Sequence, residues 1–339
     1  MQSDQNANPL IAFWIPMKST GLAVTVFLLS WVCLMCASAS EAAMYDFLQL
    51  NASPGATVTE ALGINDHGDI VGGYRDAQGS NRGFLYSNGT FTPLDVPFPV
   101  YSLLGINNSG QIVGTYRDTG DMNHGFLYSG GSYSVFDVPF PDSSFTEAFG
   151  VNESGQIVGD YHLGGLGPSG TVHGFSLSGG VYSQIDVPFS GAIGTGAAGI
   201  NNQGQIVGGY NTVSGFSHGF LLDQGTYSQI DVPFAGSSNT TAIGINNFGQ
   251  IVGHFSKDGR SHGFLMNGSN FFELDVPFEG SLATVLRGIN SSGQIVGYYL
   301  DETGEHGFLA SPSPVPIPAS LFLFASGLVG LVGFKLVKG

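Results

Sequence analysis

Five histidines recur at one position of a repeated pattern, and they are the first candidates for chemistry. Each stands before Gly-Phe, and the five are His124, His173, His218, His262 and His306. Imidazole nitrogens bind metal ions and transfer protons, but a whole repeat separates one histidine from the next. We therefore expect each histidine to bond a turn of its own repeat rather than a shared ion. The expected partners are the aspartates of the same repeats, Asp95, Asp137, Asp186, Asp231 and Asp275, and Arg82 replaces the histidine in the first repeat.

Aspartates in polar loops are the second candidates, in this case for Ca²⁺. They precede a glycine by one to three residues and are Asp76, Asp118, Asp258 and Asp301. Carboxylates and carbonyls on loops suit Ca²⁺, which takes many oxygen ligands. None of the loops has the alternating acidic spacing of a calcium loop, and Asp before Gly is typical of turns. We predict no cofactor and no metal site, with Ca²⁺ as the alternative.

Catalysis requires a nucleophile or an acid/base pair that breaks the symmetry of the repeats. Such departures are few: Asp160 and His162 at the start of the longest polar loop, and Lys257 in another repeat. The sequence has no Gly-x-Ser-x-Gly or His-Glu-x-x-His motif, no phosphate loop and no dinucleotide-binding motif. We therefore predict no catalytic residues and no enzymatic activity.

The composition points to a β protein rich in turns. Only 10% of the 339 residues are charged, against about a quarter in an average protein, while Gly contributes 53 residues and aromatic residues 12%. The formal net charge of −16 would repel a phosphate backbone, so we exclude nucleic acid as a partner. Both cysteines, Cys33 and Cys36, lie in an apolar stretch near the N-terminus, which leaves the body without a disulfide or a cysteine metal site.

Six copies of one unit make up the body of the chain. A Gly-Ile-Asn or Gly-Val-Asn tripeptide begins at Gly63, Gly105, Gly150, Gly199, Gly244 and Gly288, at spacings of 42 to 49 residues. The copies continue with Gln-Ile-Val-Gly-x-Tyr, a polar loop, His-Gly-Phe-Leu, a Gly-rich turn and, in the first five copies, Asp-Val-Pro-Phe, each motif with close variants. A fixed period of this length indicates a repeat architecture.

Each copy is predicted to form four short strands. The tripeptide ends the first strand, and Asn-x-Gly supplies a tight turn. Gln-Ile-Val-Gly-x-Tyr and His-Gly-Phe-Leu have the branched and aromatic side chains of strands two and three. The fourth strand is predicted to end at the proline of Asp-Val-Pro-Phe. Four antiparallel strands in about 44 residues form one blade of a β-propeller.

The ends of the repeat array favour a closed ring. The sixth copy stops after His306 to Ala310 and lacks its fourth strand, whereas Tyr45 to Asn51 stands where such a strand would precede the first tripeptide. A strand from the N-terminus that completes the last blade covers the open sheet edges at the junction. We predict an all-β fold, a six-bladed β-propeller spanning 44–310 and closed by an N-terminal strand, with a β-solenoid as the alternative.

The repeated motifs also carry a family resemblance. Gly-Gln-Ile-Val-Gly-x-Tyr followed by His-Gly-Phe-Leu resembles the HAF repeat of bacterial extracellular proteins, and the resemblance covers the whole body. It implies secretion and a β-repeat fold, and it names neither a ligand nor an activity.

The N-terminal segment 1–39 reads as a secretory signal peptide. Lys18 precedes the apolar stretch 21–36, and Ala37 and Ala39 flank a serine in the pattern of a cleavage site. No Lys or Arg precedes Met17, which we take as the true start. The alternative is an uncleaved membrane anchor.

The C-terminal segment 311–339 combines a Pro-rich linker with a short apolar helix and a basic tip. Val315, Pro316, Ile317 and Pro318, the apolar residues that follow and Lys335 resemble a PEP-CTERM sorting signal. The resemblance implies an exosortase as partner, association with the membrane through this helix, and delivery to the envelope or extracellular matrix of a Gram-negative bacterium. The alternative is an ordinary tail anchor.

These observations predict a non-catalytic, exported repeat protein. Loops rich in Tyr, Asn, Ser and Asp suit carbohydrate, because rings stack on sugar faces and amides bond hydroxyl groups. The predicted ligand is an exopolysaccharide or another envelope component. The alternative function is a polysaccharide-acting hydrolase or lyase that uses the channel of the propeller. In either case a site is expected where the blades depart from their six-fold symmetry.

Overall fold

The computed structural model describes residues 45–53, 55–94, 96–97, 100–164 and 170–313. The chain divides into a unit of Met1–Ser40 and a unit of Glu41–Gly339, and every described residue belongs to the second. The predicted cleavage residues Ala37 and Ala39, both predicted apolar helices and the predicted sorting residues Val315 to Pro318 and Lys335 lie outside the described residues. Within the described residues, no helix has the length and apolarity needed to cross a membrane.

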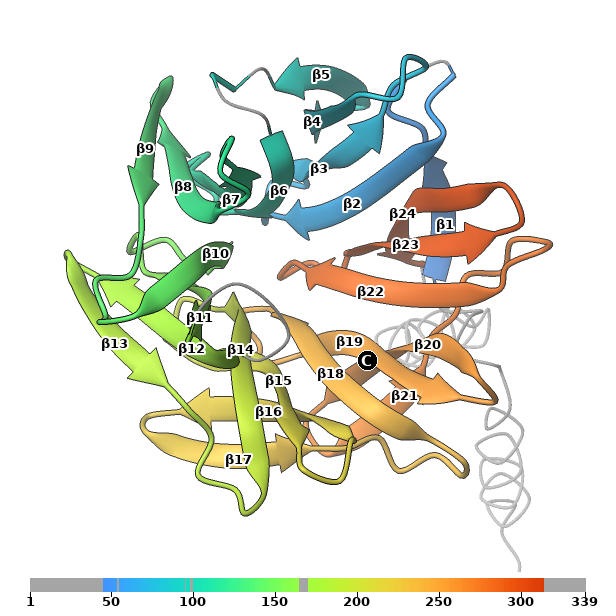
Figure 1. Ribbon diagram of the computed structural model, residues 1–339. Helices are drawn as coiled ribbons and strands as arrows, with labels where there is room; N and C mark the ends of the chain where they lie inside the picture. Colours follow the sequence, from blue (N-terminus) through green and yellow to red (C-terminus); the bar gives the residue numbers. More distant parts are fainter. Residues whose placement is uncertain (1–44, 54, 95, 98–99, 165–169, 314–339) are drawn as a thin grey trace, which may run out of the picture. The chain divides into compact units, whose positions relative to one another are not determined.

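The described residues form a six-bladed β-propeller, as the repeats predict. Each blade is an antiparallel sheet of four strands, and the first strands of the six blades surround the axis of the ring (Figure 1). The first strands are β2 (Val58–Ile64), β6 (Val100–Ile106), β10 (Ser143–Val151), β14 (Ala192–Ile200), β18 (Ser238–Ile245) and β22 (Ala283–Ile289). The second strands are β3 (Ile70–Arg75), β7 (Ile112–Arg117), β11 (Ile157–Leu163), β15 (Ile206–Thr212), β19 (Ile251–Lys257) and β23 (Ile295–Asp301).

The third and fourth strands lie progressively farther from the axis. The third strands are β4 (Asn81–Ser87), β8 (Asn123–Ser129), β12 (Thr171–Ser178), β16 (Ser217–Asp223), β20 (Arg260–Asn267) and β24 (Gly304–Pro312). The fourth strands are β5 (Thr90–Leu94), β9 (Ser132–Phe136), β13 (Val181–Ile185), β17 (Thr226–Ile230), β21 (Asn270–Glu273) and, in the sixth blade, β1 (Tyr45–Leu50).

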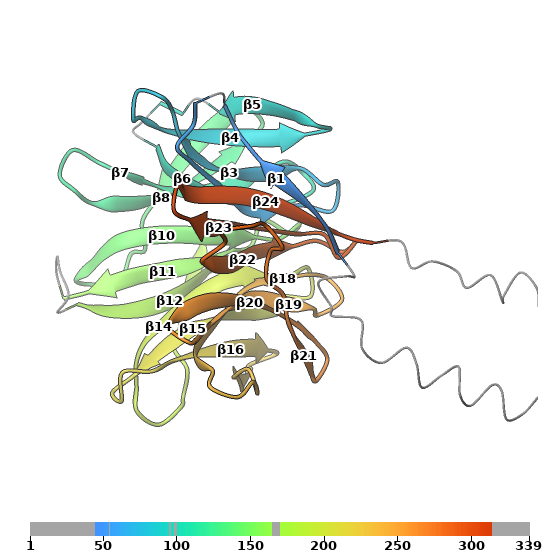
Figure 2. The same cartoon turned by 90° about the vertical axis from the view of Figure 1, so that its right-hand side faces the viewer.

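The N-terminal strand closes the ring, which confirms the predicted exchange between the two ends of the array. The sixth blade has the strand order β1-β24-β23-β22, and β1 runs beside β24 in both views (Figure 2). Phe47 lies opposite Ala310 and Leu50 opposite Gly307 in an antiparallel register. The last blade is therefore complete only when the two ends of the array pair.

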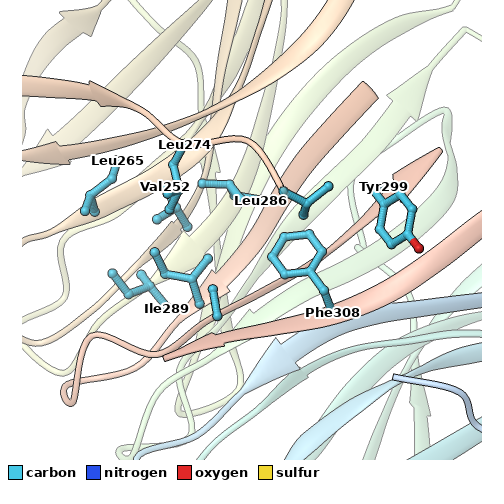
Figure 3. Packing of buried hydrophobic residues seen from close by; sticks show 10 residues of the cluster. Val252, Leu265, Leu274, Leu286, Ile289, Tyr299 and Phe308 are labelled. Carbon is cyan, nitrogen blue, oxygen red and sulfur yellow. The ribbon is translucent and has the colours of Figure 1, made fainter. Parts of the chain in front are cut away.

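The hydrophobic core consists of six clusters, each between two neighbouring blades. The cluster between the fifth and sixth blades packs Val252, Leu265 and Leu274 against Leu286 and Phe308 (Figure 3). The phenylalanine of each His-Gly-Phe motif, and of Arg-Gly-Phe in the first blade, is at most 1% exposed: Phe84, Phe126, Phe175, Phe220, Phe264 and Phe308. Because each blade buries its faces against both neighbours, the burial of apolar surface depends on the closed ring.

Two glycines of the repeat are required by close backbone approach near the axis. A Cβ on Gly105 would lie 2.6 Å from the carbonyl oxygen of Phe149 in the next blade, and a Cβ on Gly159 would lie 1.9 Å from the carbonyl oxygen of Glu147 in its own blade. Neither distance leaves room for a side chain. The first glycine lets neighbouring first strands meet, and the second fits a β-bulge in the first strand.

The Asp-Val-Pro-Phe motif is a connection between blades, so the prediction that it ends the fourth strand is wrong. The fourth strand of the third blade stops at Ile185, before Asp186. Val187 is buried, and its N–H donates to Oγ1 of Thr195 in the next blade at 3.3 Å. The hydroxyl of Thr195 thus accepts the hydrogen bond that a backbone carbonyl of a paired strand would otherwise accept. The proline follows Val187, where no further backbone N–H is needed for strand pairing.

Candidate functional site

The recurring histidines bond the aspartates of their own blades, as predicted. Nδ1 lies 2.7 to 2.9 Å from a carboxylate oxygen in the pairs His124–Asp137, His173–Asp186, His218–Asp231 and His262–Asp275. The imidazole also stacks on the aromatic ring of the second strand, for example on Tyr210 at 5.2 Å from His218. These pairs stay within single blades, and they fasten the third strand to the connection that follows the fourth.

The two exceptions to this pattern follow from the sequence of their blades. Nε of Arg82, which replaces the histidine, lies 3.2 Å from Oδ2 of Asp76. His306 stands in the blade completed by β1, where no aspartate follows; its Nε2 lies 3.0 Å from Asp301 and its Nδ1 3.5 Å from Nε2 of Gln49. Asp95 lies outside the described residues.

Three of the four loop aspartates proposed for Ca²⁺, namely Asp76, Asp118 and Asp301, accept hydrogen bonds from their own turns. Oδ1 of Asp76 accepts the N–H groups of Gln78 and Ser80 at 3.0 and 2.8 Å, and Oδ1 of Asp118 accepts those of Gly120 and Met122 at 2.8 and 2.9 Å. A carboxylate engaged in this way stabilises a turn. These contacts agree with the turn interpretation.

One cluster brings three metal-ligating side chains together. Single ligand atoms of His262, Glu273 and Asp275 lie within 4.8 Å of one another. However, Nζ of Lys257 lies 2.9 Å from Oε2 of Glu273, so an ammonium group already supplies positive charge. We describe the cluster as an ion-pair network and assign no metal to it.

On one side of the channel, the asparagines of the six tripeptides form a closed ring of hydrogen bonds. Each side-chain amide donates to the backbone carbonyl of the equivalent asparagine in the next blade, at 2.9 to 3.2 Å. The members are Asn65, Asn107, Asn152, Asn201, Asn246 and Asn290, and all are at most 4% exposed. We call this set the asparagine ring.

The residue before each tripeptide is the extra residue of a β-bulge. The register of the first strand shifts at this point in every blade, and bulges redirect side chains. The six bulge residues line a cavity of about 80 Å³ on the axis. They are Leu62, Leu104, Phe149, Ala198, Ile243 and Arg287, and we call them the bulge ring. Five of its members are apolar and one is an arginine.

A larger cavity of about 390 Å³ opens on the other side of the bulge ring, away from the asparagine ring. We call it the channel-mouth cavity. It is lined by the ring of Phe149 and the polar side chains of Tyr210, Asn211, Ser217 and Thr241, with Asp160, His254 and Arg287 as titratable members. A cavity of this volume with a mixed polar and apolar wall is of the size that small ligands occupy.

The fourth blade creates this volume because its residues are small where other blades have large ones. Gly196 occupies the position of Glu60 and Glu147, and Ala198 that of Phe149 and Arg287. Gly194, Gly209 and Ala197 also line the cavity. The cavity is therefore a departure from the six-fold pattern, encoded by the side chains of one blade.

Two basic side chains of the cavity wall have buried nitrogens without a hydrogen-bond partner. These are Nε of Arg287 and Nδ1 of His254. Burial and the neighbouring Arg287 charge lower the pKa of His254 to about 4, so its imidazole is neutral at pH 7. Burial also lowers the pKa of Arg287, although the charges of Tyr298 and Glu60 act in the opposite direction.

An acidic group lies on the wall formed by the third blade. Asp160 pairs in register with Glu147 of the neighbouring strand, and its Oδ1 is buried without a partner. Burial and the Glu147 carboxylate raise the pKa of Asp160 well above its usual range. The cavity thus has an acidic and a basic side.

Of the three symmetry-breaking residues found in the sequence, only Asp160 lines the cavity. The ring of His162 packs at a tilt against that of Phe145, with the ring centroids 5.4 Å apart, and Lys257 pairs with Glu273. His254 and Arg287 were not among the predicted residues, because both lie in strands and the predicted departures from symmetry lie in or beside loops. An alignment of the bulge positions, or of the variable residue in Gly-x-Tyr, would have shown both.

No protein-family model matches this sequence. None of the curated proteins matches it either. Similar solved structures include a protein named AofleA from Arthrobotrys oligospora, with a TM-score of 0.50 and 12% identity over 80% of this chain and 88% of that one. A fungal lectin from Aleuria aurantia, described as a six-bladed β-propeller with fucose recognition, has a TM-score of 0.47 and 14% identity over 81% and 98%. A sialidase from Trypanosoma rangeli has a TM-score of 0.46 and 10% identity over 75% and 54%. At these identities the likeness concerns the fold alone.

Proposed function

We propose that this protein is a non-catalytic carbohydrate-binding propeller whose binding site is the channel-mouth cavity. The observation that carries the proposal is the composition of the wall, where the half-buried aromatic residue Phe149 lines the same cavity as the hydroxyl- and amide-bearing residues Asn211, Ser217 and Thr241. Sugars present an apolar face and several hydroxyl groups, and such a wall can contact both. Lectins occur among the propellers of similar fold, but the proposal rests on the cavity.

The size of the cavity limits what can enter it. About 390 Å³ accommodates one or two sugar residues rather than a long chain, so a polysaccharide would insert an end or a branch. Most of the lining residues come from β10 to β12, β14 to β16 and β18 to β19, and the other three blades contribute Leu62, Leu104 and Arg287. A ligand in this position therefore contacts mainly the third, fourth and fifth blades and reaches Arg287 of the sixth.

A matched pair of glycine substitutions tests the site. Gly209 lines the cavity, whereas Gly73 is its equivalent in the first blade and lies outside it. Thr115 occupies the same position in the second blade, so threonine is compatible with the fold. We expect Gly209→Thr to weaken binding of neutral and acidic oligosaccharides in calorimetric titrations of the full chain, and Gly73→Thr to leave it unchanged. Equal binding by the wild type and both variants would contradict the assignment.

One observation favours a second function, a polysaccharide hydrolase or lyase that works in the same cavity. Asp160 has a raised pKa and stands beside Glu147, and acid/base cleavage of a glycosidic bond uses a pair of carboxyl groups. If this function is present, the wild type releases reducing ends or unsaturated products from a polysaccharide and Asp160→Asn abolishes the release. Unchanged substrate with both proteins would support the binding function.

Export to the cell envelope or matrix is part of the same proposal. Its support is the pattern of the two terminal segments, with Ala37 and Ala39 at one end and Val315 to Pro318 and Lys335 at the other. N-terminal sequencing of protein recovered outside the cytoplasm would show cleavage after Ala39. Retention of Met17 or Met1 in that material would contradict it.

A further inference from the structure

Arg287 is the one charged residue of the bulge ring. The equivalent residues are Leu62, Leu104, Phe149, Ala198 and Ile243, so the fold itself requires an apolar side chain or a small one. A guanidinium at this point is partly removed from water, which costs free energy unless an anion or hydrogen-bond acceptors compensate. The guanidinium of Arg287 therefore needs an anion or hydrogen-bond acceptors beside it.

The described part of the chain supplies only incomplete compensation. Nε of Arg287 is buried without a hydrogen-bond partner, and none of the ion pairs found there within 4.0 Å includes Arg287. The nearest charges that act on it are the carboxyl group of Glu60 and, in its ionised form, Tyr298. Burial and the charge of Glu305 raise the pKa of Glu60, whereas the charge of Arg287 lowers it.

His254, which lines the same cavity as Arg287, does not repel an anion. His254 is neutral at pH 7, and its buried Nδ1 has no partner. The acidic wall at Asp160 belongs to the third blade, whereas Arg287 belongs to the sixth. Arg287 lines both the channel-mouth cavity and the small axial cavity, so a ligand in the larger cavity reaches the guanidinium from one side.

We infer that Arg287 binds the carboxylate of an acidic sugar residue in the channel-mouth cavity. The inference rests on the proposed carbohydrate-binding function and narrows its ligand to a uronate-type saccharide. The planar guanidinium presents two N–H donors to the two oxygens of a carboxylate, and a ligand of this kind supplies hydrogen-bond acceptors and a negative charge to this side chain. The overall charge of −16 disfavours acidic ligands elsewhere on the surface, so recognition depends on this local positive charge.

The test compares acidic and neutral forms of one saccharide. Calorimetric titrations of the full chain use trigalacturonate, its carboxyl-reduced neutral counterpart and a sulfated galactose. We expect the wild type to bind trigalacturonate at least about tenfold more tightly than the neutral form. Arg287→Leu, which installs the residue present at Leu62 and Leu104, should abolish this difference. Arg117→Gln removes an exposed arginine with a contact of only 3.9 Å and should preserve it.

A second measurement separates the inference from the proposed function. The inference is wrong if the neutral and acidic forms bind equally, if Arg287→Leu keeps the preference for the acidic form, or if the sulfated sugar binds more tightly than the uronate. In each of these cases, the proposed carbohydrate-binding function still holds if Gly209→Thr weakens binding. If no saccharide binds, the thermal midpoint is measured with and without acetate. A rise for the wild type but not for Arg287→Leu would show a carboxylate site at Arg287 and would reject the carbohydrate-binding function. No effect of acetate rejects both.

Discussion

The side-chain amide of Asn290 donates a hydrogen bond of 3.0 Å to the backbone carbonyl of Asn65, across 225 positions of sequence. The bond joins the last blade to the first and completes the asparagine ring. Oδ1 of Asn290 accepts the N–H groups of Ser292 and Gln294 at 3.1 and 2.9 Å. One residue type thus shapes the turn after the first strand and links neighbouring blades.

Asn290→Ala should lower the free energy of unfolding by about 3 kcal/mol, because it leaves several buried backbone groups without partners. Asn290 is 2% exposed, so water does not readily replace the lost bonds. Chemical denaturation of the full chain measures the effect. Asn270→Ala, at an exposed position of β21, is the control and should change stability by less than about 0.5 kcal/mol. Similar midpoints for the two variants would show that the ring contributes little.

Two leucines of the closing strand β1 differ in burial, and their alanine variants can be compared. Leu50 is 2% exposed and belongs to the core between the sixth and first blades, whereas Leu48 on the same strand is 51% exposed. We expect Leu50→Ala to cost about 2 to 5 kcal/mol and Leu48→Ala less than about 1 kcal/mol. Thermal unfolding followed by circular dichroism distinguishes them. Equal effects would mean that β1 is not a structural part of the last blade.

The fold could be predicted from the sequence because the repeat is long, regular and incomplete at its end. The missing strand after Ala310 and the unmatched strand at Tyr45 predict ring closure without any knowledge of packing. The end of the fourth strand was misjudged because a side-chain hydroxyl, such as that of Thr195 for Val187, substitutes for a ladder bond. A motif that repeats six times does not reveal which of its residues pair with the next copy.

The site was harder to predict, because its residues are separated by several blades and meet only at the axis. Asp160, His254 and Arg287 occupy ordinary strand positions in the sequence. Arg287 reaches the channel through the bulge before its tripeptide, whereas Asp160 and His254 lie on the second strands β11 and β19. The sequence of a single repeat does not reveal the bulge, because a bulge is defined by the register between two paired strands.

The pKa values of two histidines should be shifted in opposite directions. Burial opposes protonation of His124, but hydrogen bonds to Asp137 and Asp118 raise its pKa above 6.5, whereas burial and Arg287 lower that of His254 to about 4. The contribution of His124 to stability is therefore complete below pH 6.5 and is lost as the pH rises through its folded pKa. Proton resonances of the two imidazoles, followed by NMR as a function of pH, give both values.

His254 also makes the protein sensitive to acid. Its folded pKa lies below the unfolded value, so the unfolded state binds the proton more tightly and stability falls as the pH drops from 6.5 toward about 4. The loss over that window should be about 3 kcal/mol. His254→Thr, which copies Thr115 of the second blade, should remove this part of the pH dependence. An unchanged acid-denaturation curve would contradict it.

Asp160 should have the opposite effect on the pH dependence of stability. Burial and Glu147 raise its folded pKa, so the folded state holds the proton more tightly and stability decreases as the pH rises from about 3.8 through the folded pKa. Asp160→Asn has the same shape without the charge, and it should raise the free energy of unfolding at pH 8 by roughly 1 to 3 kcal/mol. The gain should shrink toward pH 4, where Asp160 is protonated in the folded wild type. Asp142→Asn, at an exposed position, serves as the control with no gain at either pH. If Asp160→Asn were less stable than the wild type at pH 8, the carboxylate would have to be compensated by a group in the cavity, and the acidic wall would be a binding element in its own right.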